Sequence, residues 1–176
     1  MYFKKTKLVL AVVFIMIVTM SLGASAQNIW TAAADTCAVD EDSLLYYVDG
    51  AAYFTMNNST PDGSTVTERC MVVNPMDGGS TPGWGHLTLG FYDPGAALNS
   101  YARAILYYVP RKAPFSPVTE IMRVTSTDVL GGYGVGSNGF GHVFDFTTNV
   151  YWVAVTVYRT TNQYLIPKAY YVSLEP

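Results

Sequence analysis

The stretch VYWVAVTVYRT, residues 150–160, decides the fold class. Odd positions from 151 to 157 carry Tyr and Val, and even positions from 152 to 158 carry Trp, Ala, Thr and Tyr. Successive side chains of a β-strand point to opposite sides of a sheet, and β-branched and aromatic residues favour strands. The stretch therefore predicts a strand with one face of Tyr and Val and one mixed face.

The chain around this strand repeats the pattern in short runs separated by Gly, Pro, Asn and Asp. Residues 44–48 and 51–56 predict a hairpin, because Asp49-Gly50 accepts the positive φ angles of a type I′ turn. The glycine-rich stretch 131–141 predicts a flexible loop. Further strands are expected at residues 65–73, 85–92, 101–109, 118–125, 142–147 and 169–174. Eight or nine such strands predict an all-β fold, an antiparallel β-sandwich of jelly-roll or immunoglobulin-like type.

The composition excludes two classes of function. Hydrophobic residues make up 50% of the chain and charged residues 13%, so it can bury enough apolar surface to fold. Its 10 Lys and Arg against 13 Asp and Glu provide no basic field, so we expect no nucleic-acid partner. Its 2 His and 2 Cys cannot build a zinc cluster by themselves.

Residues 1–26 have the layout of a secretory signal peptide. Lysines at positions 4, 5 and 7 precede an apolar run, 8–20, and the small residues Ala-Ser-Ala at 24–26 form a cleavage site. An uncleaved membrane anchor is the alternative, but a spanning helix needs about 20 apolar residues and the run is shorter. We expect a single domain over residues 27–176, periplasmic or extracellular, with no transmembrane segment after cleavage.

Cys37 and Cys70 are the only cysteines in the sequence. Two cysteines of a small domain in an oxidising compartment are expected to pair. Neither lies in a Cys-x-x-Cys pair or beside a histidine, as a redox or catalytic thiol would. We therefore predict a disulfide that ties the N-terminal segment to an early strand.

Tyrosine is unusually frequent, with 14 in the chain beside 3 Trp, and this is the one excess in the composition that suggests a function. Rigid amphipathic rings on an exposed sheet face form platforms for sugar rings or for protein partners. The alternative is that tyrosine is simply a good strand former that packs half-buried. If one face is exposed, the expected ligand-binding residues are Tyr46, Trp84, Tyr92 and Trp152.

An acidic group, Asp40, Glu41 and Asp42, supports a calcium hypothesis. Clustered carboxylate oxygens are the ligands that Ca²⁺ requires, although the EF-hand spacing is absent. The alternative is a solvated acidic turn. No other cofactor is predicted.

A small secreted hydrolase is the catalytic alternative. It would need His86 or His142 to meet a carboxylate such as Glu68 or Glu120 in three dimensions. The pattern Gly134-x-Gly136-x-x-Gly139 matches a dinucleotide motif, but no helix is expected after it to receive a phosphate, so we interpret it as a plain loop.

Several short motifs together resemble small exported bacterial proteins with a single disulfide-linked β domain and no assigned activity. The residues that carry the resemblance are Cys37 to Ser43, Glu68-Arg69-Cys70, Val73-Asn74-Pro75, Trp84, Asp93, Phe144-Asp145-Phe146, Tyr151 and Arg159. The resemblance covers most of the chain after residue 26. It implies an envelope or extracellular location and the Cys37–Cys70 bridge, and it implies no catalytic residue.

These observations favour an exported, non-catalytic β-sandwich with a binding or structural role. Its partner would be an envelope protein or, through an aromatic face, a polysaccharide. A carbohydrate-binding module is thus one form of this hypothesis, and the secreted hydrolase is the alternative from another class. Because sandwiches host both binding and catalysis, the fold class alone does not separate them.

Overall fold

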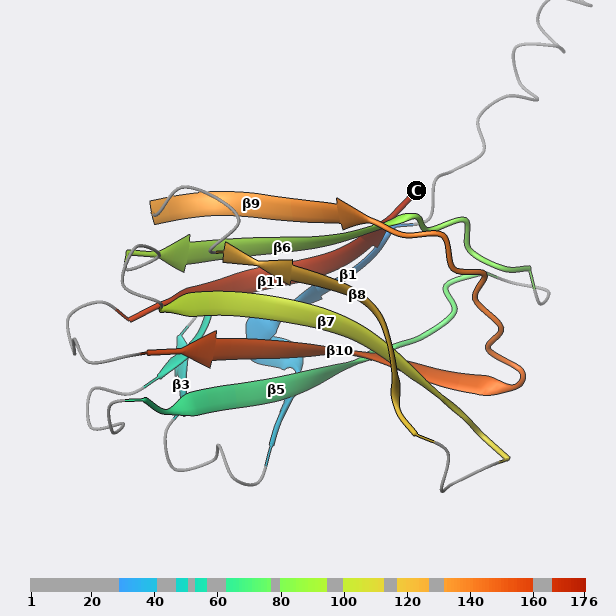
Figure 1. Ribbon diagram of the computed structural model, residues 1–176, viewed down its shortest axis with the longest axis horizontal. Coiled ribbons are helices and arrows are strands. Elements are labelled where there is room, and N and C mark those ends of the chain that lie inside the picture. The colour runs from blue at the N-terminus through green and yellow to red at the C-terminus, as the bar shows by residue number, and fades with distance from the viewer. Residues whose placement is uncertain are drawn as a thin grey trace, which may run out of the picture.

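Two antiparallel sheets face each other in the computed structural model of the chain (Figure 1). The structure describes residues 29–40, 47–50, 53–56, 63–76, 80–94, 100–112, 117–126, 132–159 and 166–176. The signal peptide predicted for residues 1–26 lies outside this range. Within the described residues, no helix has the length and apolar character to cross a membrane.

One sheet has six strands. Its main order is β3 (Tyr47–Gly50), β4 (Tyr53–Met56), β11 (Lys168–Glu175), β6 (His86–Asp93) and β9 (Gly132–Gly139). The short strand β1 (Trp30–Ala33) also pairs with β11, through residues 171–174. Strand β4 pairs with the beginning of β11, at Lys168 and Ala169. Strands β1 and β4 therefore pair with different parts of β11.

The second sheet has five strands. Its order is β2 (Ala38–Val39), β5 (Thr65–Val72), β10 (Asn149–Tyr158), β7 (Tyr101–Pro110) and β8 (Thr119–Thr125). The 150–160 stretch is thus the central strand β10, and its predicted alternation is confirmed: Tyr151, Val153, Val155 and Val157 are buried. A short 3-10 helix, η1 (Ala34–Thr36), joins β1 of the first sheet to β2 of the second.

The connectivity is that of a jelly roll. Strands β4 to β11 divide into the orders β4-β11-β6-β9 and β5-β10-β7-β8, so the chain changes sheets at every connection between them except the one from β7 to β8. The predicted antiparallel β-sandwich is confirmed. Of the two types left open, this strand order is the jelly roll.

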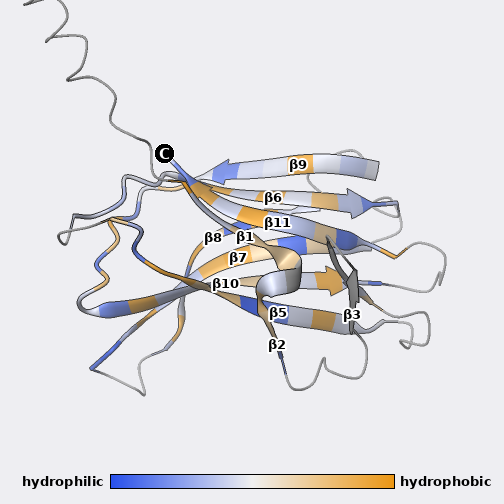
Figure 2. Ribbon diagram, turned by 180° about the vertical axis from the view of Figure 1, so that it is seen from behind, coloured by the Kyte–Doolittle hydropathy of each residue, from blue (hydrophilic) through white to orange (hydrophobic). Residues whose placement is uncertain are grey.

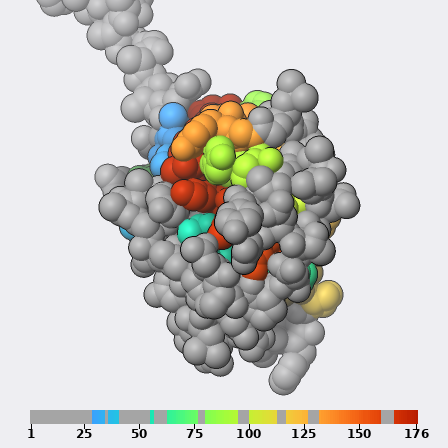
Figure 3. Space-filling view, turned by 90° about the vertical axis from the view of Figure 1, so that its left-hand side faces the viewer, coloured from blue at the N-terminus to red at the C-terminus, as the bar shows by residue number. Residues whose placement is uncertain are grey.

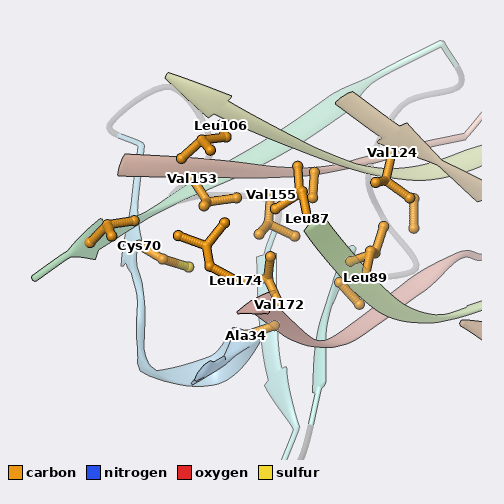
Figure 4. Close-up of a cluster of buried hydrophobic side chains, with 14 of the residues drawn as sticks. Ala34, Cys70, Leu87, Leu89, Leu106, Val124, Val153, Val155, Val172 and Leu174 are labelled. Atoms are coloured by element: carbon orange, nitrogen blue, oxygen red, sulfur yellow. The ribbon is translucent and has the colours of Figure 1, made fainter. Parts of the chain in front are cut away.

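The core fills the space between the two sheets (Figure 4). Hydrophobic stretches recur along β5, β6, β10 and β11, as the alternation of a strand between core and solvent requires (Figure 2). The labelled side chains of the core include Leu87, Leu89, Leu106, Val124, Val153, Val155, Val172 and Leu174. Burial of this apolar surface holds the two sheets together.

The predicted disulfide is present. Cys37, which directly follows η1, is bonded to Cys70 of β5, with 4.6 Å between the two Cα atoms. It fastens the segment that crosses from one sheet to the other, as expected. A disulfide is also consistent with an oxidising compartment, periplasmic or extracellular.

Three local predictions are wrong. The glycine-rich stretch 131–141, expected as a loop, contains the edge strand β9. Residues 142–147, expected as a strand, have no strand structure and end in a turn. The third concerns only the position of a turn. The expected hairpin is present as β3 paired with β4, but Asp49 and Gly50, expected as its turn, pair with Phe54 and Tyr53 inside the ladder.

Candidate functional site

The outward surface of the five-stranded sheet carries two stacked pairs of aromatic rings. Trp152 of β10 lies opposite Tyr107 of β7, with ring centroids 5.6 Å apart and planes inclined by 28°. Tyr158 lies opposite Tyr101 on the same two strands, with centroids 5.0 Å apart and planes inclined by 25°. All four positions point away from the core, because the intervening residues on each strand are buried in it.

Between the two ring pairs lie non-aromatic side chains, Arg103 and Ile105 on β7 and Ala154 and Thr156 on β10. We call the whole surface the Trp152 face: Thr67, Arg69, Tyr101, Arg103, Ile105, Tyr107, Arg123, Trp152, Ala154, Thr156 and Tyr158. The hydroxyl oxygens of Thr67 and Thr156 are 3.1 Å apart across β5 and β10. Ala154 is the next outward-facing residue of β10 after Trp152. Because its side chain is small, the surface forms a depression next to the two rings.

A groove of about 600 Å³ runs over this lower part of the Trp152 face. Trp152 and Tyr107 line it, together with Thr67, Arg69 and Thr156. The groove therefore combines flat apolar ring surface with hydroxyl and guanidinium groups. That combination suits a ligand that has both an apolar face and polar edges.

Charged groups border the groove in fixed pairs. The Arg69 guanidinium is 2.8 Å from the Asp40 carboxylate, and the Arg123 guanidinium is 2.8 Å from the Glu120 carboxylate. Burial raises the pKa of the Tyr107 hydroxyl above its ordinary value of 10.0, and the charge of Glu120 raises it further. Tyr107 therefore keeps its proton at neutral pH and can donate a hydrogen bond.

Arg103 is held differently from these two arginines. Its guanidinium carbon lies 4.2 Å from the centre of the Tyr101 ring, a cation–π contact. Its Nε–H donates to the Thr125 hydroxyl at 3.3 Å. Among the described residues, no carboxylate is paired with it.

Three of the four aromatic residues expected on one face lie in the described part of the chain, and the structure separates them. Trp152 lies at the groove, whereas Tyr92 lies on the other sheet, in β6. Trp84 is 3% exposed and packs edge-on against Phe144, with ring centroids 5.0 Å apart, so its indole belongs to the core and offers no exposed platform. Tyr46 lies outside the described residues. The stacking partner of Trp152 is Tyr107, which the sequence analysis did not name.

Tyr92 belongs to a second aromatic surface, the Tyr133 patch, formed by Tyr92, Tyr133 and Tyr170. Ring centroids are 4.6 Å apart between Tyr92 and Tyr133, and 6.0 Å between Tyr133 and Tyr170. Figure 3 views the end of the sandwich where β6, β9 and β11, in green, orange and red, lie side by side. Tyr133 is 78% exposed, and a hollow of about 350 Å³ adjoins it above Gly90 and Gly134.

The two histidines have structural surroundings. His86 Nδ1 is 3.0 Å from the Pro176 carbonyl oxygen, and His142 Nε2 is 3.2 Å from the Tyr151 hydroxyl. Burial lowers the pKa of His142 below its ordinary value of 6.5. Within the described part of the chain, neither imidazole is hydrogen-bonded to an Asp or Glu side chain, the contact that the hydrolase hypothesis requires.

The Asp145 carboxylate, which is close to His142 in sequence, has other partners. It accepts hydrogen bonds from the hydroxyl groups of Thr147 and Thr148, each at 2.6 Å. These bonds, together with those from the two backbone N–H groups, lower the pKa of Asp145 to about 2. The carboxylate therefore stabilises the turn before β10 and stays ionised.

The calcium hypothesis is not tested by the described residues. Of its three carboxylates, Asp40 is bonded to Arg69, while Glu41 and Asp42 lie outside the described range. A different cluster brings ligand atoms of Cys37, Glu68 and Cys70 within 4.8 Å of one another. Both of its sulfur atoms are joined in the disulfide, so neither can act as the thiolate that a metal would bind.

Comparison with known proteins finds no matching family model and no curated protein of similar sequence. Among solved structures, the chain is similar to a xylan-binding module, CBM15, with 11% identity over 85% of this chain and 97% of that one, at a TM-score of 0.48. A family two carbohydrate esterase from Cellvibrio japonicus is 14% identical over 84% of this chain and 33% of that one, at a TM-score of 0.41.

A third solved structure is the CBM36-1 domain of a multidomain xylanase from the hindgut metagenome of Trinervitermes trinervoides. It is 13% identical over 85% of this chain and 98% of that one, at a TM-score of 0.38. At such identities and scores these likenesses concern overall shape and assign no residue of the Trp152 face.

Proposed function

We propose that this protein is an exported, non-catalytic binding module that takes a polysaccharide on the Trp152 face. The observation that carries the proposal is the stacked Trp152–Tyr107 pair at the side of a groove of about 600 Å³. A sugar ring presents C–H groups on its faces and hydroxyl groups around its edge. The flat rings offer contact to the first, and the threonine and arginine side chains offer hydrogen bonds to the second.

The spacing of the ring pairs favours an extended ligand over a single sugar. Trp152 and Tyr158 are six residues apart on β10, which corresponds to about 20 Å at about 3.4 Å per residue. A polysaccharide lying along the strand direction would meet one aromatic pair, then the threonines, then the other pair. A small molecule would contact only one part of the face.

Preorganisation also favours binding at this surface. Trp152 and Tyr107 hold each other by stacking, and both project from paired strands in the middle of a sheet. Ligand binding therefore orders few side chains and loses little conformational entropy. Exposed rings on a mobile loop would lack this advantage.

Affinity electrophoresis of the oxidised protein tests the proposal. We would compare gels that contain arabinoxylan, hydroxyethylcellulose, polygalacturonate or alginate with a gel without polysaccharide. We expect retardation in at least one gel, and we expect Trp152→Ala to abolish it. The matched control is Tyr133→Ala, which removes an exposed ring from the opposite sheet and should leave retardation unchanged. Retardation in no gel, or equal retardation of both variants, would contradict the proposal.

Calcium binding by Asp40, Glu41 and Asp42 is a separate part of the proposal. The gels with the neutral polymers arabinoxylan and hydroxyethylcellulose, run with Ca²⁺ and then with EDTA, would test it, because polygalacturonate and alginate bind Ca²⁺ themselves. Weaker retardation in EDTA would support a metal site in the acidic segment. Identical mobility in both conditions would contradict a role for the metal in binding.

A further inference from the structure

We infer that the polysaccharide bound by the Trp152 face is acidic, and that Arg103 receives a sugar carboxylate between the two ring pairs. This inference rests on the proposed function and names the class of ligand. It follows from how Arg103 is held, from the charges along the groove and from the distribution of arginines over the protein.

Arg103 has the geometry of a prepared carboxylate receptor. The Tyr101 ring supports one face of its guanidinium at 4.2 Å, and Thr125 accepts from its Nε–H at 3.3 Å. These two contacts restrain the plane of the group. The N–H groups on its two terminal nitrogens have no protein acceptor among the described residues. This pair of nitrogens is the edge that binds a carboxylate with two parallel hydrogen bonds.

Arg103 lies where a ligand on the face would pass. It is directly opposite Thr156, which lines the groove, and it stands between the row of Trp152 and the row of Tyr158 on the same sheet. A chain that contacts both ring pairs would therefore pass Thr156 and lie beside Arg103.

The described charged groups in and beside the groove favour an anionic ligand over a cationic one. Arg69 is the one charged side chain among its described lining residues, and no carboxylate lines it. Two of the arginines on the face are bonded to carboxylates, Arg69 to Asp40 and Arg123 to Glu120. Among these described groups, Arg103 therefore leaves one positive charge without a paired acid.

This local excess contrasts with the rest of the chain. The formal net charge of the protein is −3, yet three of its five arginines project from this one face. Arginine binds a carboxylate in a planar, two-point geometry that lysine cannot reproduce. A neutral polysaccharide would make no use of this arrangement.

The test compares Arg103→Gln with wild type and with Lys168→Gln by isothermal titration calorimetry. Glutamine keeps a polar side chain but removes the charge, and Lys168→Gln makes the same change of charge on the opposite sheet. The probes are polygalacturonate, alginate, neutral arabinoxylan and dextran sulfate. We expect wild type to prefer the two carboxylated polymers, and we expect Arg103→Gln to weaken their binding about tenfold while Lys168→Gln does not. Raising NaCl from about 0.05 to about 0.5 M should weaken wild-type binding more than that of Arg103→Gln.

The possible failures are distinguishable. If arabinoxylan binds as tightly as polygalacturonate, and Arg103→Gln binds like wild type while Trp152→Ala does not bind, the acidic assignment is overturned and the proposed function stands. If dextran sulfate binds as tightly as the carboxylated polymers, attraction by charge alone explains the result, and the carboxylate assignment is overturned. Binding of none of the four probes overturns this inference, and it overturns the proposed function as well if hydroxyethylcellulose also fails to retard the protein.

Discussion

Tyr107 and Trp152 are cross-strand partners whose rings stack at 5.6 Å on the solvent side of β7 and β10. The same two strands form the middle of the five-stranded sheet, and their inward residues fill the core. The ring pair is thus positioned by the most extensively paired part of the fold. A ligand that uses these rings would meet a surface that needs no rearrangement.

Stacking between Tyr107 and Trp152 should appear as a coupling free energy. A double-mutant cycle with Tyr107→Ala and Trp152→Ala, measured by urea unfolding, is expected to show about 0.5–1.5 kcal/mol of interaction, as for other aromatic pairs. The reference cycle combines Trp152→Ala with Tyr101→Ala, because Tyr101 stacks on Tyr158 instead. Equal coupling in the two cycles would show that the ring contact does not stabilise the sheet.

The Cys37–Cys70 bridge should stabilise the protein strongly. It closes a loop with a sequence separation of 33, for which the chain-entropy account gives about 3–4 kcal/mol. We expect reduction with dithiothreitol to lower the urea midpoint of wild type by a corresponding amount. The double variant Cys37→Ser with Cys70→Ser should have the low midpoint with or without reductant. A wild-type midpoint that reduction does not change would contradict this role.

Gly134 should be intolerant of a side chain. A Cβ atom there would lie 2.8 Å from the tip of the Phe91 ring, so this ring, which is 1% exposed and packed in the core, would have to shift. Gly134→Ala is therefore expected to destabilise the protein by about 1–3 kcal/mol, as overpacking of a core does. Gly141→Ala is the control, because nothing lies within 4 Å of its added Cβ. Similar unfolding midpoints for the two variants would refute the packing argument.

The same contact explains why β9 was missed in the sequence. Glycine lowers strand propensity, so the stretch 131–141 indicates a loop when it is considered alone. In the fold, Gly134 lies opposite Phe91 on β6, and the absent side chain makes room for that ring. Strand formation here depends on a partner distant in the sequence, which local patterns do not contain. By contrast, β10 was predicted because its alternation is local.

The site was only partly predictable for a similar reason. The alternation predicts that Trp152 shares one strand face with Ala154, Thr156 and Tyr158, and the structure shows that Trp152 lies on the solvent side of β10. Strand order, however, decides which other rings share its face. Tyr107 joins Trp152 because β7 pairs with β10, whereas Tyr92 is on a strand of the other sheet and Trp84 is in the core. The sequence identifies aromatic residues on strands, but without the order of the strands it does not show which of these residues lie next to one another.

Stability should fall as the pH decreases below about 6.5 because of His142. Burial lowers the pKa of this imidazole in the folded protein, and its ordinary value of 6.5 applies to the unfolded chain. Between the two values the unfolded state binds more protons, so stability is fully present above pH 6.5 and is lost as the pH falls toward the folded pKa. The measurement is the free energy of unfolding from pH 8 to pH 5.

The control for this prediction is His142→Gln, which does not titrate in that range. Its stability should change less between pH 8 and pH 5 than that of wild type. The Tyr151 hydroxyl accepts a hydrogen bond from the Asp145 backbone N–H at 2.9 Å, a contact that does not involve the imidazole and that the substitution leaves available. Parallel pH profiles for the two proteins would exclude His142 as the cause.

Tryptophan fluorescence tests polysaccharide binding at the Trp152 face most directly. Trp30 and Trp84 are 8% and 3% exposed, so Trp152 is the tryptophan that a ligand on the surface can contact. We predict that titration with polygalacturonate shifts the emission of wild type to shorter wavelength, because a stacked sugar excludes water from the indole. We predict no shift for Trp152→Phe. A shift of equal size in Trp152→Phe, or none in wild type with polygalacturonate, alginate or arabinoxylan, would contradict the account.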